Sequence, residues 1–587
     1  MVKKFSALAL TGLLALPLTA GAASQEDLQE QIDNLSQQLE ELKADQQYIQ
    51  DDVDANIEDW NLASRFKFSG DFRARVDSMS AEAPSQYSAG NVADSMVSIA
   101  DAMTLGNASV GYIENQLVPM FRSMSASQRN QLIQNGVIPA GSLGGGQPPA
   151  DIPFTAATPD PAQDYDNDSL FTNRLRLNMQ VKAMENVTFK GRLAMYKTYG
   201  GQSTPLEFGG PFTTSALSFD GTTARQPDDN DLIVDQAYVN WNNIADLPIW
   251  FSIGRRPTTD GPPEHIRMGN DPADTMATPT AFMNYPFDGA TFGYAYFNPL
   301  GNEGSGRVRL CIGRGFESGV TTNDDHINDT DFAGINWDVY KKDDLFINFQ
   351  SFRVFNMFNI PSDVDFPNIL EMSLHGYDTP YQVRDVDGNG VIDSDENGML
   401  DRTNLGDIQH TSFAAMDKWR NLNYFLSAGW SRTDPSGVDE MGTGLLTSWW
   451  DEDATDSKDG YSVYAGARYD LDDLGLKLGL EYNFGSEDWI SFTPGHDDLY
   501  QAKLATRGSV YEAYMIYDIP AGWKISEYSK AFMRLGYQHY DYDYTGSGFW
   551  LGEPQDIDDL ADDPLAAQMY PAIEEMDQVY LTFEARF

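Results

Sequence analysis

The chain has 587 residues, of which 41% are hydrophobic and 22% charged, and its formal net charge is −49. This hydrophobic content excludes a disordered chain, and the acidic excess argues against a nucleic-acid partner, because phosphate binding needs an excess of Lys and Arg. Cys311 is the only cysteine, which excludes an intramolecular disulfide, a CxxC redox pair and CxxCH haem attachment.

The N-terminus has the pattern of an export signal. Lys3 and Lys4 precede an apolar stretch from Phe5 to Leu18, and Ala20-Gly21-Ala22 is a small-residue cleavage motif. We expect residues 1–22 to be a signal peptide cleaved near Ala22. The alternative, a membrane-anchoring helix, would need about 20 apolar residues. No later stretch is apolar enough for such a helix, which leaves a soluble exported protein or an outer-membrane β-barrel.

A heptad pattern follows the signal peptide. The apolar residues in it are spaced by four and three, and they are Leu28, Ile32, Leu35, Leu39 and Leu42. This spacing predicts an N-terminal α-helical coiled coil over residues 24–58 in the periplasm, and hence a homo-oligomer, with a trimer as the expected number. The alternative is a single amphipathic helix that docks on its own barrel.

From residue 65 the apolar residues recur at every second position. Phe66, Phe68 and Phe72 alternate with Arg65, Lys67 and other polar residues. The same alternation recurs in 174–183, 187–195, 461–470 and 476–484. Strands of this length with this period are typical of membrane-spanning strands. A soluble β-sandwich is the alternative.

The connections between these strands are sorted by length. Short turns are predicted near 185–186, 243–248, 298–306, 341–344, 420–421, 472–475 and 520–529. Long segments are predicted near 79–170, 200–231, 257–286, 317–330, 358–407, 433–459, 486–505 and 544–576. Seven short and eight long connections predict an all-β fold, a transmembrane antiparallel β-barrel of about 16 strands over residues 65–587. The extracellular insertion 79–170 contains helix-like stretches and could form either a constriction or a surface lid.

The chain ends in an alternating strand. Val579, Leu581, Phe583 and Phe587 alternate with polar residues, and Phe587 is the last residue. A terminal Phe on such a strand is the signal that the barrel-assembly machinery of the outer membrane recognises. We therefore expect insertion into the lipid of the cell outer membrane.

Cations gather on the polar side of the first three strands. The predicted pore-lining residues are Arg65, Lys67, Arg73, Arg75, Arg174, Arg176, Lys182, Lys190 and Arg192. Only Asp71 and Asp77 share their side in these strands, which predicts a basic wall and a weakly anion-selective pore. The alternative is that acidic loops fold inward and neutralise the wall.

One loop has the spacing of an EF-hand calcium site. Its predicted ligands are Asp385, Asp387, Asn389, Val391 through its carbonyl, Asp393 and Glu396. This spacing wraps oxygen ligands around one Ca²⁺ ion, which would hold the 358–407 loop together. The alternative is an acidic, Gly-rich turn that binds no metal. The six histidines form no HExxH motif, and GxSxG and P-loop motifs are missing, so we expect no enzyme activity.

The export signal, coiled coil and roughly 16 strands ending in Phe resemble the trimeric outer-membrane porins with an N-terminal periplasmic coiled coil, which include the phosphate-selective type. The segments 66–75 and 253–257 are similar to the matching parts of those porins. The chain also resembles an uncharacterised family of outer-membrane proteins from anaerobic, metal-reducing proteobacteria. The arginine ladder of the phosphate-selective type has no match. We therefore expect a porin for small hydrophilic solutes, or alternatively a barrel that sheathes a separate multihaem cytochrome or scaffolds a surface complex.

Overall fold

A computed structural model of the chain describes residues 65–104, 107, 109–138, 151–199, 227, 231–256, 287–297, 303–318, 327–359, 373, 402–439, 442–447, 455–492, 502–520 and 529–587. The predicted signal peptide (1–22), coiled coil (24–58) and calcium loop (385–396) lie outside these residues. The chain divides into two units, Met1–Phe66 and Lys67–Phe587, and the second contains the barrel. In the described part of the chain, no helix has the length and apolar character needed to cross a bilayer.

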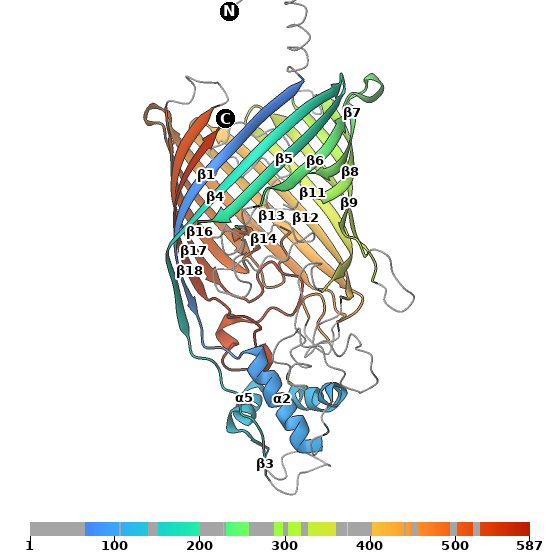
Figure 1. The fold of residues 1–587 in the computed structure, drawn as a ribbon, viewed down its shortest axis with the longest axis vertical. Helices are drawn as coiled ribbons and strands as arrows, with labels where there is room; N and C mark the ends of the chain where they lie inside the picture. The colour runs from blue at the N-terminus through green and yellow to red at the C-terminus, as the bar shows by residue number, and fades with distance from the viewer. Residues whose placement is uncertain are drawn as a thin grey trace, which may run out of the picture. The chain divides into compact units, whose positions relative to one another are not determined.

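Sixteen strands form one closed barrel in which each strand pairs with the next along the chain (Figure 1). They are β1 (Phe66–Ala83), β4 (Gln163–Met184), β5 (Val187–Thr198), β6 (Ile233–Trp241), β7 (Ile249–Arg256), β8 (Phe287–Phe297), β9 (Ser305–Phe316), β10 (Thr330–Lys342), β11 (Leu345–Phe358), β12 (Asn404–Trp419), β13 (Leu422–Pro435), β14 (Asp459–Leu471), β15 (Leu476–Gly485), β16 (Gly508–Asp518), β17 (Lys530–Tyr542) and β18 (Glu575–Arg586). The predicted strand number is confirmed, and short and long connections alternate as expected.

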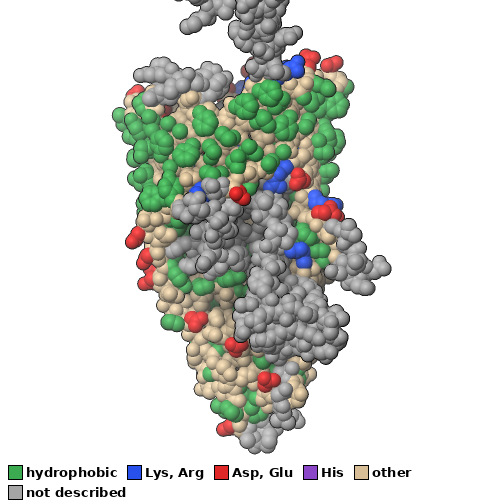
Figure 2. All heavy atoms as spheres, in the orientation of Figure 1, with side chains coloured by type: hydrophobic (Ala, Val, Ile, Leu, Met, Phe, Trp, Pro, Cys, Tyr) green, Lys and Arg blue, Asp and Glu red, His purple; other side chains and the backbone are tan. Residues whose placement is uncertain are grey.

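The strands have two chemically different faces, as β18 shows. Val579, Leu581 and Phe583 point outward and are 47%, 39% and 40% exposed, whereas the intervening Tyr580 and Thr582 are fully buried on the inward face. On the face of the barrel seen in Figure 2, the apolar side chains form a band. This is the arrangement of a transmembrane barrel and the reverse of a soluble β-sandwich, which turns its apolar rows inward.

Aromatic residues border the band at both ends. Near the short turns the outward row includes Trp419, Tyr424, Tyr469 and Tyr517, and near the long loops it includes Trp430, Tyr461, Tyr482 and Tyr511. The eight steps from Tyr469 back to Tyr461 cover about 27 Å along the strand, or about 20 Å of thickness at a strand tilt of about 40°. That thickness is close to the apolar band of an outer-membrane barrel.

The insertion after β1 begins later than the sequence indicates. β1 continues to Ala83 and β4 begins at Gln163, so the insertion comprises 84–162 rather than 79–170. Beyond Asp77 the alternation inverts: Met79 and Ala81 are buried on the inward face while Ser78 and Ser80 are exposed outside. The strand pairing thus continues past the apolar band, where the outward face is polar and the sequence pattern no longer resembles a membrane strand.

Four α-helices and a π-helical turn belong to the described part of this insertion. They are α2 (Ala89–Thr104), α3 (Val110–Tyr112), a π-helical turn (Ile113–Leu117), α4 (Val118–Arg122) and α5 (Ala126–Asn135), and the short strands β2 (Val137–Ile138) and β3 (Ile152–Pro153) follow. The capping box of α5, in which Ser125 and Gln128 bond each other's backbone N–H groups, fixes where that helix begins.

Phe587 extends the β1–β18 ladder that closes the barrel. The backbone N–H of Gly70 donates to the carbonyl of Phe587 (2.8 Å), and the N–H of Phe587 donates to the carbonyl of Gly70 (3.0 Å). A Cβ atom on Gly70 would lie 2.7 Å from the Phe587 ring, so only glycine leaves room for that ring. Phe587 is therefore the final rung of the β1–β18 ladder.

Large inward rings lie flat across glycines of the neighbouring strand. A Cβ atom on Gly536 would lie 2.1 Å from the ring of Tyr580, and one on Gly479 would lie 2.1 Å from the ring of Tyr514. Because both glycines lack a side chain, the rings rest on the backbone of the adjacent strand. At these two positions the inner face of the sheet is covered by a ring.

Candidate functional site in the barrel lumen

The predicted pore-lining cations lie on or beside three adjacent strands. Arg73, Arg75, Arg174 and Arg192 are buried on the inward face, Arg176 and Lys190 are partly buried, and Arg65, Lys67 and Lys182 are exposed near the short-turn end. The structure thus separates a buried group within the wall from an exposed group at one mouth. Burial of this kind requires paired charges.

Carboxylates on the strands themselves pair with the buried cations. Arg75 donates through Nη2 to Asp77 Oδ1 (2.6 Å), and Asp71 accepts from Arg174 (3.3 Å) and from Arg176 (2.8 Å). Two further carboxylates complete the wall: Asp235 pairs with Arg192, and Glu584 pairs with Arg174 and Arg586. Asp235 and Glu584 escaped the sequence analysis because Asp235 lies on β6, beyond a long loop, and Glu584 lies on β18, which reaches this wall only through barrel closure.

A second polar cluster lies on β9–β11. Asp338 accepts from Arg309 (2.6 Å) and from Arg307, and Asn348 donates to the same carboxylate (2.7 Å). In both clusters one carboxylate serves two guanidinium groups, so the inner wall carries more cations than anions in these regions.

The β15–β16 loop enters the lumen through Lys503. The Lys503 ammonium donates to Glu512 Oε2 (2.6 Å) and to Glu481, and all three side chains are 1% exposed. Tyr464 donates to Glu481 and Tyr580 donates to Glu512, so both carboxylates are also hydrogen-bonded to the wall. The sequence predicted an ordinary long loop here. No local pattern around Lys503 indicates that it pairs with Glu481 of β15 and Glu512 of β16 inside the barrel.

Trp489 anchors the other end of the same loop. Its indole Nε1 donates to the carbonyl of Leu504 (2.8 Å), and its ring lies over Gly429, where a Cβ atom would be 2.4 Å from the ring. The backbone N–H of Ile490 donates to Ser431 on β13 (3.1 Å). The described parts of this loop are therefore bound to the inner face of the sheet.

Parts of two other long loops join this filling. Leu445 and Leu446 from the β13–β14 loop and Trp550 from the β17–β18 loop are buried with Ile490 and Phe492 in one apolar cluster. The inward strand residues of this cluster include Phe352, Val354 and Ile408. Protein thus occupies part of the lumen at the long-loop end, and the pore wall there is loop as well as strand.

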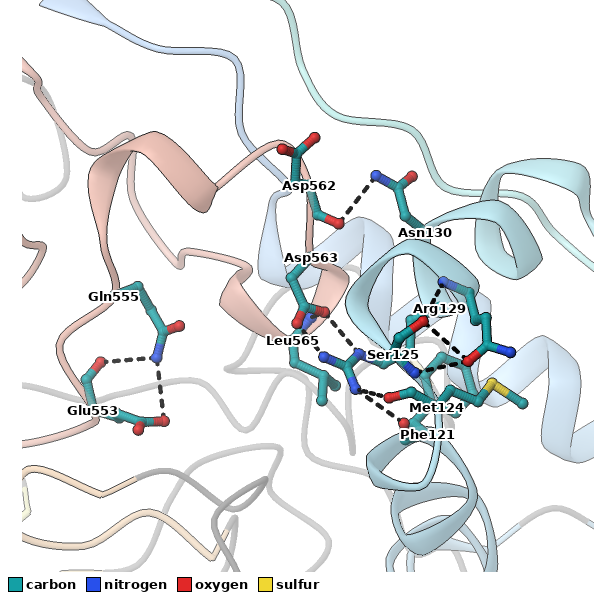
Figure 3. A network of polar contacts seen from close by, with 11 residues as sticks. Phe121, Met124, Ser125, Arg129, Asn130, Glu553, Gln555, Asp562, Asp563 and Leu565 are labelled. Carbon is teal, nitrogen blue, oxygen red and sulfur yellow. Dashed lines mark hydrogen bonds and ion pairs between the residues drawn. The ribbon is translucent and has the colours of Figure 1, made fainter.

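The helical insertion packs on the β17–β18 loop. Val92, Met96 and Phe121 share an apolar core, against which Leu565 and Ala567 pack. Figure 3 shows Arg129 of α5 donating to Asp563 (Nε to Oδ1, 2.8 Å), with Asn130 bonding the carbonyl of Asp562. The buried residues of this core come from the insertion itself, so the insertion has an apolar core of its own.

We expect Arg129→Gln to loosen the insertion without affecting the barrel. The change removes the ion pair with Asp563 and the bonds that Arg129 donates to the carbonyls of Phe121 (3.1 Å) and Met124 (2.6 Å). Such charge-assisted bonds contribute about 1–3 kcal/mol each when partly buried. Hydrogen exchange should accelerate in residues 89–135 and stay unchanged in β10–β16. The exposed Asp94→Asn on α2 is the control, and equal exchange in both variants would contradict the expectation.

The same end of the barrel should become more stable in mild acid. Burial raises the pKa of Asp543, and the neighbouring carboxylates Asp541 and Asp556 raise it further; burial and nearby Glu575 likewise raise the pKa of Glu574. A raised carboxyl pKa means that the folded state binds the proton more tightly than the unfolded state, so stability rises as pH falls through that pKa. Protection factors in the β17–β18 loop, which correct for the intrinsic fall of the exchange rate with pH, should therefore rise between pH 7 and about pH 5. In Asp556→Asn this rise should be smaller, and protection factors that fall in acid would oppose this assignment.

Residues 164–587 match the family described as "Protein of unknown function (DUF3373)", and the chain belongs to this family. No curated protein matches the chain. Among solved structures it is similar to OmpT of Vibrio cholerae (8% identity, TM-score 0.33, covering 89% of this chain and 97% of the other). It is also similar to Salmonella typhi OmpF in complex with daunomycin (10% identity, TM-score 0.35, covering 88% of this chain and 97% of the other). A third similar structure is the Acinetobacter baumannii outer membrane channel DcaP (10% identity, TM-score 0.35, covering 89% of this chain and 97% of the other). Likenesses this distant concern only the barrel fold.

Proposed function

We propose that the chain is a porin of the outer membrane, through which small hydrophilic solutes diffuse passively. The observation that supports this most directly is the two-faced strand: apolar side chains outside and charged, hydrogen-bonded side chains inside, around sixteen strands. A barrel of this strand number encloses an aqueous space unless loops fill it. The loop segments bound to the inner wall would narrow that space and set the size of the solutes.

The proposed preference for anions is weak because two charge distributions oppose each other. Asp71 and Asp338 are each shared by two arginines, which gives the wall a local cation excess around these two carboxylates. The eight long connections, in contrast, hold 46 acidic and 9 basic residues. We propose that the wall acts along the narrow path and that most of the loop charges are in water, where salt screens them. Anion preference should therefore grow as the salt concentration rises.

Planar-bilayer recording of the purified protein tests this proposal. We expect single-channel conductance and a reversal potential in a potassium chloride gradient that favours chloride. Arg176→Gln should shift that potential toward potassium, because Arg176 is partly exposed in the lumen, whereas Arg176→Lys should not. Preference for potassium in the unaltered protein would refute the anion preference alone. No conductance, together with a co-purifying haem protein, would favour the alternative of a barrel that sheathes a multihaem cytochrome.

Export and assembly follow from the same proposal. We propose that residues 1–22 are removed near Ala22, that residues 24–58 form the coiled coil of a homotrimer, and that Phe587 is recognised by the barrel-assembly machinery. The last of these is supported by the place of Phe587 at the closing rung, opposite Gly70. Phe587→Ser should lower the amount of heat-modifiable, folded barrel recovered from outer membranes.

We also propose that Asp385, Asp387, Asn389, Val391, Asp393 and Glu396 bind Ca²⁺ and fold the loop between β11 and β12. Hard cations prefer oxygen ligands at this spacing. Removal of calcium with a chelator should make this loop sensitive to protease. The double variant Asp385→Asn, Glu396→Gln should be sensitive with or without calcium, and calcium that binds this variant as tightly as the unaltered protein would contradict the site.

A further inference from the structure

Charged residues alternate across four neighbouring strands on the outside of the barrel. Arg255 on β7, Asp288 on β8, Arg314 on β9 and Asp331 on β10 are successive cross-strand partners. Arg314 Nε lies 2.9 Å from Asp331 Oδ1, and Arg255 Nη1 lies 3.8 Å from Asp288 Oδ2. Since neighbouring strands are about 4.8 Å apart, the four residues form a continuous row of alternating charge, which we name the ion-pair collar.

The collar continues on the next four strands. Arg353 on β11 bonds Asp407 on β12 (2.9 Å) and also reaches Asp434 on β13. Arg432 on β13 bonds Asp459 on β14 (3.2 Å). An arginine thus stands near the long-loop end of each of four alternate strands, β7, β9, β11 and β13, with its carboxylate partner on the strand that follows.

The collar residues point outward. Arg255 follows Ile253 on the outer face of β7, and Arg314 follows Ile312 on that of β9, where the two isoleucines are 51% and 55% exposed. The side chains of Arg314, Arg353 and Arg432 are 41%, 35% and 50% exposed, and that of Arg255 is 15% exposed. Figure 2 shows basic and acidic side chains along the edge of the apolar band. The collar therefore lies where the band meets the long-loop side of the membrane.

The ion pairs of the collar add little to the stability of the sheet, so stability alone does not explain why they are present. Exposed ion pairs contribute only about 0–1 kcal/mol each, and charged side chains this close to the apolar band lose hydration. A lipid headgroup would replace that lost hydration. Guanidinium groups bind phosphate in a two-pronged manner, and the carboxylates beside them bind divalent cations, which in turn bind phosphate.

We propose that the ion-pair collar binds phosphorylated glycolipid headgroups of the outer leaflet together with bridging divalent cations. This inference rests on the proposed outer-membrane location. The carboxylates outnumber the four arginines, because Glu317 and Asp329 also contact Arg314. Phosphates would therefore meet a net negative surface, so binding requires the divalent cation as well as the arginines.

The test compares vesicles of phosphatidylcholine with and without lipid A, a diphosphorylated glucosamine lipid, in Mg²⁺ or in a chelator. The full-length protein is inserted, extracted in mild detergent, and its bound lipid A is quantified by mass spectrometry. We expect lipid A to be retained in Mg²⁺ and lost in the chelator. The triple variant R314Q/R353Q/R432Q should retain about tenfold less, since one charged contact is worth at least that factor.

Two controls separate the possible results. The triple Arg→Lys variant keeps the charges and should retain lipid A within a few-fold, while Asp331→Asn with Asp407→Asn should weaken the dependence on Mg²⁺. Heat-modifiable mobility confirms that each variant is folded. Equal lipid A retention by the unaltered protein and the Arg→Gln variant would overturn the inference. The ion-pair collar would then serve only to link neighbouring strands of the barrel. Failure of the protein to insert into either kind of vesicle would instead overturn the proposed membrane location.

Discussion

Lys503→Met should release the β15–β16 loop from the lumen and raise the single-channel conductance. The substitution leaves Glu481 and Glu512 buried without the ammonium that both contact. Removing one member of a buried charge cluster typically costs about 3–5 kcal/mol, and undocking the loop avoids most of that cost by admitting water. Bilayer recording and limited proteolysis of the loop would measure the two effects.

A charge-balanced variant distinguishes release of the loop from general damage. The triple variant Lys503→Met, Glu481→Gln, Glu512→Gln leaves no unpaired charge and should recover much of the docking. Lys530→Met, at the exposed start of β17, should leave conductance unchanged. If Lys503→Met conducts like the unaltered protein and its loop resists protease equally, Lys503 does not hold the loop in place.

Leu480→Arg should destabilise the barrel in lipid by about 2–4 kcal/mol. Leu480 on β15 is 67% exposed and lies within the apolar band, two residues from Tyr482 of the aromatic row. In water, an exposed Leu→Arg change is worth less than about 0.5 kcal/mol. The large cost therefore arises only if lipid covers this face. Urea or guanidinium titration of the barrel in vesicles would measure it.

Val438 provides a control position for Leu480, because it is also an exposed apolar residue. Val438 is 37% exposed in the β13–β14 loop, outside the apolar band, so Val438→Arg should change the free energy of unfolding very little. If Leu480→Arg is as mild as Val438→Arg, the outer face does not contact lipid, and the porin proposal loses its support.

The barrel was predictable because its strands show their two faces locally. In β18, the alternation of Val579, Leu581 and Phe583 with polar residues is visible in the sequence, and the structure places those residues outside. Turn positions followed from the same pattern, as at Asn186 and Arg420. The end of β1 was missed because its outward face becomes polar at Ser78, where the strand leaves the apolar band and the local rule reverses.

The interior was less predictable because its contacts join residues far apart in the chain. Arg192 meets Asp235 across a long loop, and Arg174 meets Glu584 only because the first and last strands close the barrel. The basic residues and two of their partners, Asp71 and Asp77, were found from their side of the strand, but Asp235 and Glu584 were not. The docking of Lys503 and Trp489 depends on wall positions that no local pattern reveals.

The rings that rest on Gly536 and Gly479 limit how the width of the lumen can be changed by substitution. A ring that lies along the neighbouring strand projects little into the lumen. Replacing the glycine beneath it would push the ring toward the barrel axis or strain the sheet. These two rings therefore lie against the barrel wall, and the loop segments docked inside the barrel narrow the lumen further. A wider pore is best engineered by shortening the loops that dock inside the barrel, while Gly536 and Gly479 are kept.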